Sequence, residues 1–209
     1  MVNKKIIISI LSIVSIICFW IFSIIVKRKV LNSLDFDLTV IIQNHVPKRF
    51  DVYLSILSLI GSFEVLLIAL FIIVLLRKKV ISYLILPIFG FAHLVEFLGK
   101  SFITHPGPPF MFARYSFPFV FPTSYVQPGF SYPSGHSLRI VFLAVIIMYL
   151  TAFSKKFSVN KKLLINTGVL LFTFLMLVTR VSLGEHWTTD VIGGSLLGFG
   201  FGILSLIFI

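Results

Sequence analysis

Residues 188–209 read TTDVIGGSLLGFGFGILSLIFI, a stretch whose only ionisable side chain is Asp190, close to its start. About 20 consecutive apolar residues are enough for a helix to cross the hydrocarbon core of a bilayer. The stretch therefore predicts a membrane-spanning helix. Glycines recur in it at every fourth position, at Gly194, Gly198 and Gly202. Small residues at this spacing let two helices approach closely, so we expect these glycines to have a packing role.

Apolar runs of similar character occur five more times along the chain, at residues 6–26, 54–76, 80–98, 138–153 and 163–178. Of the 209 residues, 58% are hydrophobic and 12% are charged, and the mean hydropathy is +1.07. Soluble domains carry about twice that share of charge. We expect an all-α fold, with residues 1–209 forming one membrane domain of six transmembrane helices. The first run is followed by Lys27, Arg28 and Lys29, which favours a retained anchor over a cleaved signal peptide.

The charge pattern predicts how the chain is oriented. Its net charge of +11 resides mostly in short basic clusters at the ends of apolar runs. This is typical of a membrane protein, and it argues against nucleic-acid binding because no basic stripe follows a polar face. Clusters within residues 4–5, 77–79 and 155–162 fall on the side of both termini, which we interpret as the cytoplasmic side of a cell membrane. Clusters at 27–29 and 48–49 oppose that orientation.

Two segments outside the spans have their own character. Residues 34–46 carry apolar side chains at near-helical spacing, and we expect them to lie along the outer membrane interface. Residues 101–133 are rich in proline and aromatic residues. That composition excludes a continuous helix and favours the headgroup level. The loop is either an interfacial anchor or a wall that guides a lipid tail toward a site.

Three short polar stretches, far apart in sequence, fall on the outer side of the predicted bundle. Lys100 ends the third span, and Pro-Ser-Gly-His at residues 133–136 opens the fourth. Arg180, His186 and Asp190 lie around the turn between the fifth and sixth spans. Polar groups near a bilayer are costly, so their convergence indicates a functional site at the outer membrane face.

The cationic and small residues of this group suit the binding of a phosphate. Lys100 and Arg180 can neutralise the non-bridging oxygens, and the guanidinium offers a planar fork. Ser134 is suited to cap the helix that follows it. The free N–H groups at that helix start form an anion site, which Gly135 lets a phosphate approach closely.

The two histidines suit the chemistry of phosphoryl transfer. His186 and Asp190 are four residues apart and share a face of a helical turn. A carboxylate on one ring nitrogen fixes the tautomer and leaves the other nitrogen free to attack phosphorus. His136 can then act as general acid toward the leaving oxygen. Because Lys100 and Arg180 supply positive charge, we expect neither a metal nor another cofactor.

These residues resemble the three motifs of the type 2 phosphatidic acid phosphatase family, K-x6-R-P, P-S-G-H and S-R-x5-H-x3-D. The second motif is intact, and the third has Thr179 in place of serine; together the motifs span residues 100–190. The resemblance implies a nucleophilic His186 that forms a phosphohistidine, which water then hydrolyses. It also implies that Asp190 orients the nucleophile and that His136 is the acid. The phosphate would then be held by Lys100, Ser134, Gly135 and Arg180.

The first motif departs from the family at one position. Six residues separate Lys100 from Gly107-Pro108, so Gly107 stands where the family has arginine. Arg114, in the same loop, is a candidate substitute for phosphate binding, and His105 is a weaker one.

The neighbouring charged residues have simpler interpretations. Glu96 is expected to pair with Lys100, Glu185 to face solvent, and Arg139 to extend its charge toward water. Glu64 is expected to face the interior of the bundle.

The function predicted is a membrane lipid phosphate or diphosphate phosphatase, with its active site on the extracytoplasmic side. Undecaprenyl diphosphate, phosphatidic acid and phosphatidylglycerol phosphate are all candidate substrates. A lipid phosphotransferase with the same site is one alternative. A non-catalytic member of the family, favoured by Gly107, is another. Vanadium haloperoxidases share the motifs but lack six apolar spans.

Overall fold

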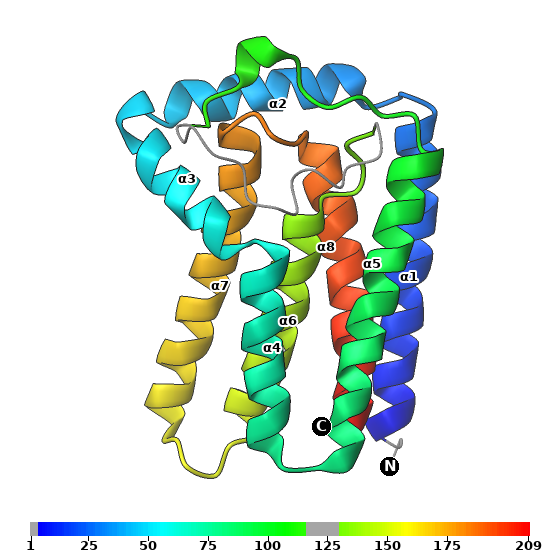
Figure 1. Cartoon of the computed structure of the whole chain (residues 1–209), viewed down its shortest axis with the longest axis vertical. Helices are drawn as coiled ribbons and strands as arrows, with labels where there is room; N and C mark the ends of the chain where they lie inside the picture. Colours follow the sequence, from blue (N-terminus) through cyan, green and yellow to red (C-terminus); the bar gives the residue numbers. More distant parts are fainter. Residues whose placement is uncertain (1–3, 116–129) are drawn as a thin grey trace.

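The computed structural model describes residues 4–115 and 130–209, and within those ranges every regular element is a helix (Figure 1). The all-α prediction is confirmed. The α-helices and short 3-10 helices (η) occur in the order α1 (Lys4–Lys27), α2 (Asn32–His45), η1 (Lys48–Phe50), α3 (Asp51–Ile60), α4 (Phe63–Arg77), η2 (Val80–Leu84), α5 (Ile85–Phe102), η3 (Phe110–Phe112), α6 (Gly135–Ala152), α7 (Val159–Ser182), α8 (Thr188–Ser205) and η5 (Leu206–Phe208).

Five helical segments are long and apolar enough to cross a membrane. They are α1, η2 with α5 (Val80–Phe102), α6, α7, and α8 with η5 (Thr188–Phe208). A sixth candidate span joins η1 and α3 (Lys48–Ile60) to α4 (Phe63–Arg77), with a bend of 50° between the two parts. Figure 1 shows one bundle of helices with both chain ends at the same end of it. The multi-pass membrane bundle is therefore confirmed.

The bend in the second span was not expected, because residues 54–76 form one apolar run. The structure ends α3 at Ile60 and begins α4 at Phe63. The carbonyl oxygen of Gly61, in the break, accepts a hydrogen bond from Nε of Arg139 on α6, at 3.1 Å. A Cβ on Gly61 would lie 2.8 Å from the ring of His136. The break therefore brings backbone of the second span against the polar start of α6.

Helix α2 lies across the end of the bundle that is opposite to the termini (Figure 1). This is the segment expected at the outer interface, and it does lie outside the six spans. It is tied down by Asp35, whose carboxylate is buried. Thr189 at the start of α8 donates to that carboxylate from its backbone nitrogen, at 2.9 Å, and from its hydroxyl, at 2.6 Å.

The glycines of α8 pack directly against the backbone of α6. A Cβ on Gly194 would collide with the carbonyl oxygen of Ser134, and one on Gly198 would collide with that of Leu138. A Cβ on Gly202 would lie 3.2 Å from a backbone Cα of α6. The predicted packing role is confirmed, and the two helices that carry His136 and Asp190 are held in close contact.

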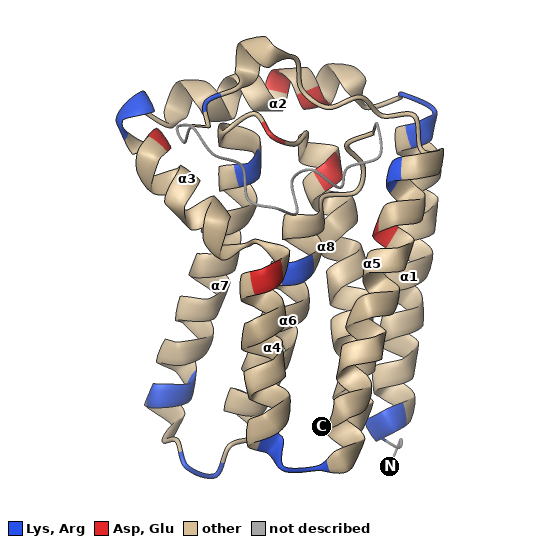
Figure 2. Cartoon of the chain, in the orientation of Figure 1, with Lys and Arg blue, Asp and Glu red and all other residues tan. Residues whose placement is uncertain are grey.

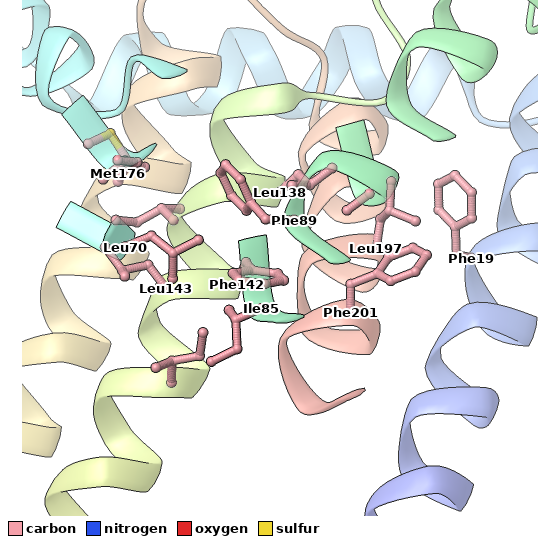
Figure 3. Close-up of a cluster of buried hydrophobic side chains, with 14 of the residues drawn as sticks. Phe19, Leu70, Ile85, Phe89, Leu138, Phe142, Leu143, Met176, Leu197 and Phe201 are labelled. Carbon is pink, nitrogen blue, oxygen red and sulfur yellow. The ribbon is translucent and has the colours of Figure 1, made fainter. Parts of the chain in front are cut away.

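A cluster of buried hydrophobic side chains fills the space between the helices around this contact (Figure 3). It takes side chains from six helices, among them Phe19 of α1, Leu70 of α4, Phe89 of α5, Phe142 of α6, Met176 of α7 and Leu197 of α8. Because close-packed interiors resist displacement, this core fixes the helix ends above it.

Basic residues cluster at the end of the bundle that carries both termini, whereas the opposite end holds acidic and basic residues together (Figure 2). The clusters at residues 77–79 and 155–162 lie in the turns and the adjoining helix ends at the end that carries the termini. Their common side agrees with the charge pattern of the sequence. The assignment of that side to the cytoplasm stays a prediction.

Candidate active site

Seven of the eight predicted site residues lie together at helix ends on the side away from the termini. Lys100 is in the last turn of α5, and Ser134, Gly135 and His136 begin α6. Arg180 is in the last turn of α7, His186 is in the turn that follows, and Asp190 is in the first turn of α8. His136 lies within electrostatic range of Lys100, Arg180 and His186. We call this group the catalytic cluster, after the role that the sequence predicts for it.

The His186 ring is held by the first turn of α8. Its Nδ1 lies 3.3 Å from Oδ2 of Asp190 and 3.1 Å from the hydroxyl of Ser131. Ser131 also donates to Oδ2 of Asp190, as does the backbone nitrogen of Trp187, at 2.9 Å. A carboxylate beside Nδ1 places the proton on that nitrogen. Nε2 then keeps a lone pair for attack on phosphorus.

The backbone of the turn fixes where His186 stands. Gly184 has φ +68, and a Cβ there would collide with the carbonyl oxygen of Phe112. Only glycine meets both conditions. The backbone nitrogens of Glu185 and His186 both donate to the carbonyl oxygen of Arg180, at 3.1 and 3.2 Å. The nucleophile candidate and the cation before it are therefore parts of one rigid turn.

Burial of His186 lowers its pKa below the ordinary value of 6.5. The hydrogen bond and the negative charge of Asp190 act in the opposite direction, and the positive charges of Lys100 and Arg180 add to the lowering. The pKa of the ring is thus below neutrality, because burial outweighs the carboxylate. At neutral pH the imidazole is uncharged, which is the form that a nucleophile requires.

Both cations of the catalytic cluster have a carboxylate partner. Nζ of Lys100 lies 3.6 Å from Oε1 of Glu96, one helical turn earlier, as predicted from the sequence. Nη1 of Arg180 lies 2.5 Å from Oε2 of Glu185 and also donates to the hydroxyl of Ser58 on α3. The expectation that Glu185 faces solvent is wrong, because the turn directs its carboxylate onto Arg180.

Buried polar atoms of the catalytic cluster lack a partner within the described chain. Nε of Arg180 and the hydroxyl of Ser134 are buried and have no hydrogen-bond partner among residues 4–115 and 130–209. Such groups cost about 1–3 kcal/mol each when left unpaired. The backbone nitrogen of Ser134 donates to the carbonyl oxygen of Asp190, at 3.0 Å. The start of α6 is thus fastened to the start of α8, with free donors beside the contact, which suits an anion.

Arg114 lies outside the catalytic cluster. Its guanidinium donates to both carboxylate oxygens of Asp51, at 3.1 and 2.6 Å, and to the backbone oxygens of Gln43 and Val46. A bidentate ion pair of this kind holds the guanidinium in place. Arg114 therefore links its loop to α2 and α3. It offers no support for the predicted role in phosphate binding.

Arg139 is buried, so the expectation that its charge extends toward water is wrong. Only 7% of the residue is exposed. Its Nη2 lies 3.2 Å from Nδ1 of His136, in addition to the contact of Nε with Gly61. Glu64 and Glu96 lie within electrostatic range of the guanidinium. The charge therefore has carboxylates near it inside the protein, and it contacts the catalytic cluster through His136.

A second polar group behind Asp190 was not predicted. Nε2 of His105 lies 3.6 Å from Oδ1 of Asp190, 3.5 Å from Oδ2 of Asp35 and 3.2 Å from the hydroxyl of Thr189. The backbone nitrogen of Ser131 donates to the carbonyl oxygen of His105, at 2.9 Å. These contacts fix both Asp190 and Ser131. The sequence offered no signal for Ser131. In the sequence, Asp35 is one of several charged residues of the interfacial segment, and nothing distinguishes it.

Gly107, at the altered position of the first motif, borders an open space. The described atoms nearest to a Cβ at this position belong to Ser131, 3.6 Å away. A cavity of about 310 Å³ beside it is lined in part by Phe36, Pro109 and Trp187. The position has room for a side chain and lies next to the residue that contacts His186 and Asp190. The predicted wall for a lipid tail falls partly on residues 116–129, which lie outside the described residues.

Comparison with known proteins places the chain in a family. The family model described as "PAP2 superfamily" matches residues 79–209, more than half of the chain. The chain belongs to the PAP2 superfamily. This confirms the resemblance found in the motifs, and the matched PAP2 region contains every residue of the catalytic cluster.

Relatives of this PAP2 chain include two bacterial proteins. It is 35% identical over 124 residues to phosphatidylglycerophosphatase B of Bacillus subtilis, a match covering 58% of this chain and 55% of that protein. It is 34% identical over 76 residues to phosphatidylglycerophosphatase B of Haemophilus influenzae, covering 35% of this chain and 30% of that protein. The chain thus matches about half of the length of the first relative and about a third of the second.

Two solved structures share the fold of the PAP2 chain. One is a transmembrane PAP2-type phosphatidylglycerolphosphate phosphatase from Bacillus subtilis, with a TM-score of 0.76, 24% identity and 94% of each chain covered. The other is LpxE of Aquifex aeolicus, with a TM-score of 0.61, 24% identity, and 83% of this chain and 95% of that chain covered. The helical arrangement is therefore shared with a transmembrane PAP2-type protein and with LpxE.

Proposed function

We propose that this PAP2 superfamily member is a membrane phosphatase that hydrolyses a lipid phosphate or diphosphate through a phosphohistidine on His186. The observation that carries the proposal is the pairing of His186 with Asp190, with His136, Lys100 and Arg180 close enough to influence the two histidines electrostatically. Nδ1 is engaged and Nε2 is left for attack. The names of the bacterial relatives, both phosphatidylglycerophosphatases, support a phosphorylated lipid as the substrate class.

The cluster supplies a part for each stage of the reaction. A phosphate would bind between Lys100, Arg180 and the N–H groups at the start of α6, where unpaired donors stand. Nε2 of His186 would attack phosphorus and displace the lipid oxygen, with His136 as the donor toward that oxygen. Water would then release phosphate from the histidine. Because these groups provide the positive charge, the reaction is proposed to need no metal.

The position of the cluster fits a substrate that stays in the bilayer. The reactive residues lie at the ends of the spans, on the side opposite to the termini. A lipid headgroup reaches such a site while its tail remains in the bilayer. The basic end of the bundle is proposed to face the cytoplasm. The site then lies on the extracytoplasmic side of the cell membrane.

The test is phosphate release by the purified full-length chain in detergent, with a chelator present, across a panel of lipid phosphates and diphosphates. His186→Ala is expected to abolish release, whereas His45→Ala, which removes an exposed histidine on α2, leaves release unchanged. Rapid quenching of a reaction with labelled substrate should trap an acid-labile phosphoryl group on the wild type. Release by a folded His186→Ala protein would refute the mechanism.

Two alternatives are settled by the same preparation. A phosphotransferase would hand the phosphoryl group to an added lipid alcohol in preference to water. A non-catalytic protein would release no phosphate from any member of the panel.

A further inference from the structure

The contact between Arg139 and His136 determines which nitrogen of the histidine carries a proton. Nη2 of Arg139 lies 3.2 Å from Nδ1 of His136, and both residues are on the first turns of α6. A guanidinium can donate hydrogen bonds but cannot accept them. Nδ1 must therefore be the acceptor and carry no proton. The neutral ring that results has its proton on Nε2.

Arg139 cannot turn away easily, because its surroundings hold it. Nε donates to the carbonyl oxygen of Gly61, at 3.1 Å, in the break of the second span. Nη1 lies 2.9 Å from the point where a Cβ of Gly135 would stand, beside the carboxylate of Glu96. The contacts with Gly61 and His136 hold the guanidinium, and only 7% of the residue is exposed.

The other charges around His136 also disfavour a second proton on the ring. Arg180, Arg139, His186 and Lys100 all lie within electrostatic range of it. Two of these groups are guanidinium groups and a third is the amine of Lys100, so an imidazolium would add a like charge beside basic side chains. Glu96 faces Lys100 and Arg139 instead. Position 136 therefore suits an uncharged hydrogen-bond donor.

We propose that Arg139 restricts His136 to hydrogen bonding through Nε2–H and thereby selects lipid diphosphates over lipid phosphate monoesters. The inference rests on the proposed phosphatase function. Nε2 of His186 bonds to the terminal phosphorus, and the bond from that phosphorus to the bridging oxygen breaks. The electron pair stays on the bridging oxygen of the departing lipid monophosphate. The Nε2–H of His136 donates to that oxygen without giving up its proton.

The two substrate classes differ in what they require of this donor. A lipid monophosphate is a stable anion near neutrality, since the second pKa of a phosphate monoester is about 6. It leaves without being protonated. A monoester substrate must instead expel an alkoxide, which is far more basic and needs a proton from an acid. A neutral histidine whose Nδ1 is blocked does not supply that proton.

The experiment compares kcat/KM for an isoprenoid diphosphate and for the monophosphate of the same isoprenoid, using the purified full-length protein. General acid catalysis contributes about 10²- to 10⁴-fold, so the wild type is expected to favour the diphosphate by about 10²-fold or more. In Arg139→Leu the ratio should fall by about tenfold or more, because His136 is then free to be protonated. Arg139→Lys, which keeps a cationic donor, should retain most of the preference.

Arg49→Leu is the matched control, because that arginine is exposed on η1. A purely structural role of Arg139 would lower both rates together and leave the ratio unchanged, which would overturn the inference. So would a wild type that hydrolyses both lipids equally well. A wild-type protein that hydrolyses neither lipid would instead contradict the proposed function.

Nuclear magnetic resonance of ¹⁵N-histidine-labelled wild-type protein gives a test that needs no folded Arg139 variant. The signal of His136, assigned by its loss in His136→Asn, should show one unprotonated Nδ1 and one protonated Nε2 near neutral pH. An imidazolium signal at that position would overturn the inference.

Discussion

Ser131 offers a test of the catalytic cluster because sequence motifs give it no role. Its hydroxyl donates to Oδ2 of Asp190 and lies 3.1 Å from Nδ1 of His186. Ser131→Ala removes one of three donors to that carboxylate oxygen, leaving the Trp187 nitrogen and the histidine itself. The pairing of His186 with Asp190 should persist, but the carboxylate should be less well oriented.

The size of the effect follows from the charge of the acceptor. A hydrogen bond to a charged group contributes about 1.5–3 kcal/mol, and two other donors remain, so the lower figure applies. At about 1.4 kcal/mol for each factor of ten, Ser131→Ala should lower kcat about tenfold. KM should change little, because the Ser131 hydroxyl contacts His186 and Asp190 and not Lys100 or Arg180, which would hold the phosphate.

The assay is phosphate release by purified wild-type and variant proteins under saturating lipid phosphate. Ser195→Ala is the matched control, since that hydroxyl, on α8 like Asp190, donates only to the carbonyl oxygen of Val191 one turn earlier. It should retain the wild-type rate. A Ser131→Ala protein with a kcat within twofold of wild type would show that this contact does not support His186.

Three further predictions concern titration, phosphate access and packing. Because burial lowers the pKa of His186 below 6.5, the nucleophile is unprotonated at neutral pH. Activity limited by it should stay level on the neutral side and fall only as the pH drops through that lowered pKa; a pH profile of kcat/KM with its acid limb above pH 6.5 would contradict this. Glu185→Gln removes the carboxylate that is paired with the guanidinium of Arg180, so the KM for a lipid phosphate should decrease about two- to fivefold. An increase in KM, measured by steady-state kinetics, would contradict this prediction. Gly198→Ala forces a Cβ into the backbone of α6 and should destabilise the protein by about 1–3 kcal/mol, seen as a lower unfolding temperature in detergent. Gly168→Ala, where a Cβ meets no described atom within 4 Å, should show no such change.

The spans were predictable because length and hydropathy alone define them. Five of the six apolar runs correspond to helices that the structure places across the bundle, with ends shifted by a few residues. The break at Gly61 was not predictable, because the carbonyl group in the break has its hydrogen-bond partner, Arg139, on another span. A glycine within an apolar run gives no local sign of such a bend.

The catalytic cluster was predictable because its residues have chemistry that apolar surroundings do not explain. Their supports were not, since serine and aspartate are common at interfaces and helix starts. Asp35 becomes a buried anchor only because α2 lies over the start of α8. Glu185 contacts Arg180 only because the turn folds back onto the last turn of α7.

The broken second span has a consequence for how such a protein can diversify. The family match begins at residue 79, yet Ser58 and Gly61, which precede it, hold Arg180 and Arg139. The catalytic cluster and the segment whose residues contact Arg180 and Arg139 are therefore separate stretches of one chain. Exchanging residues 1–78 for those of another superfamily member should alter the order of preferred lipids while His186 remains essential. A chimera with an unchanged substrate profile would show instead that residues 79–209 alone determine the choice.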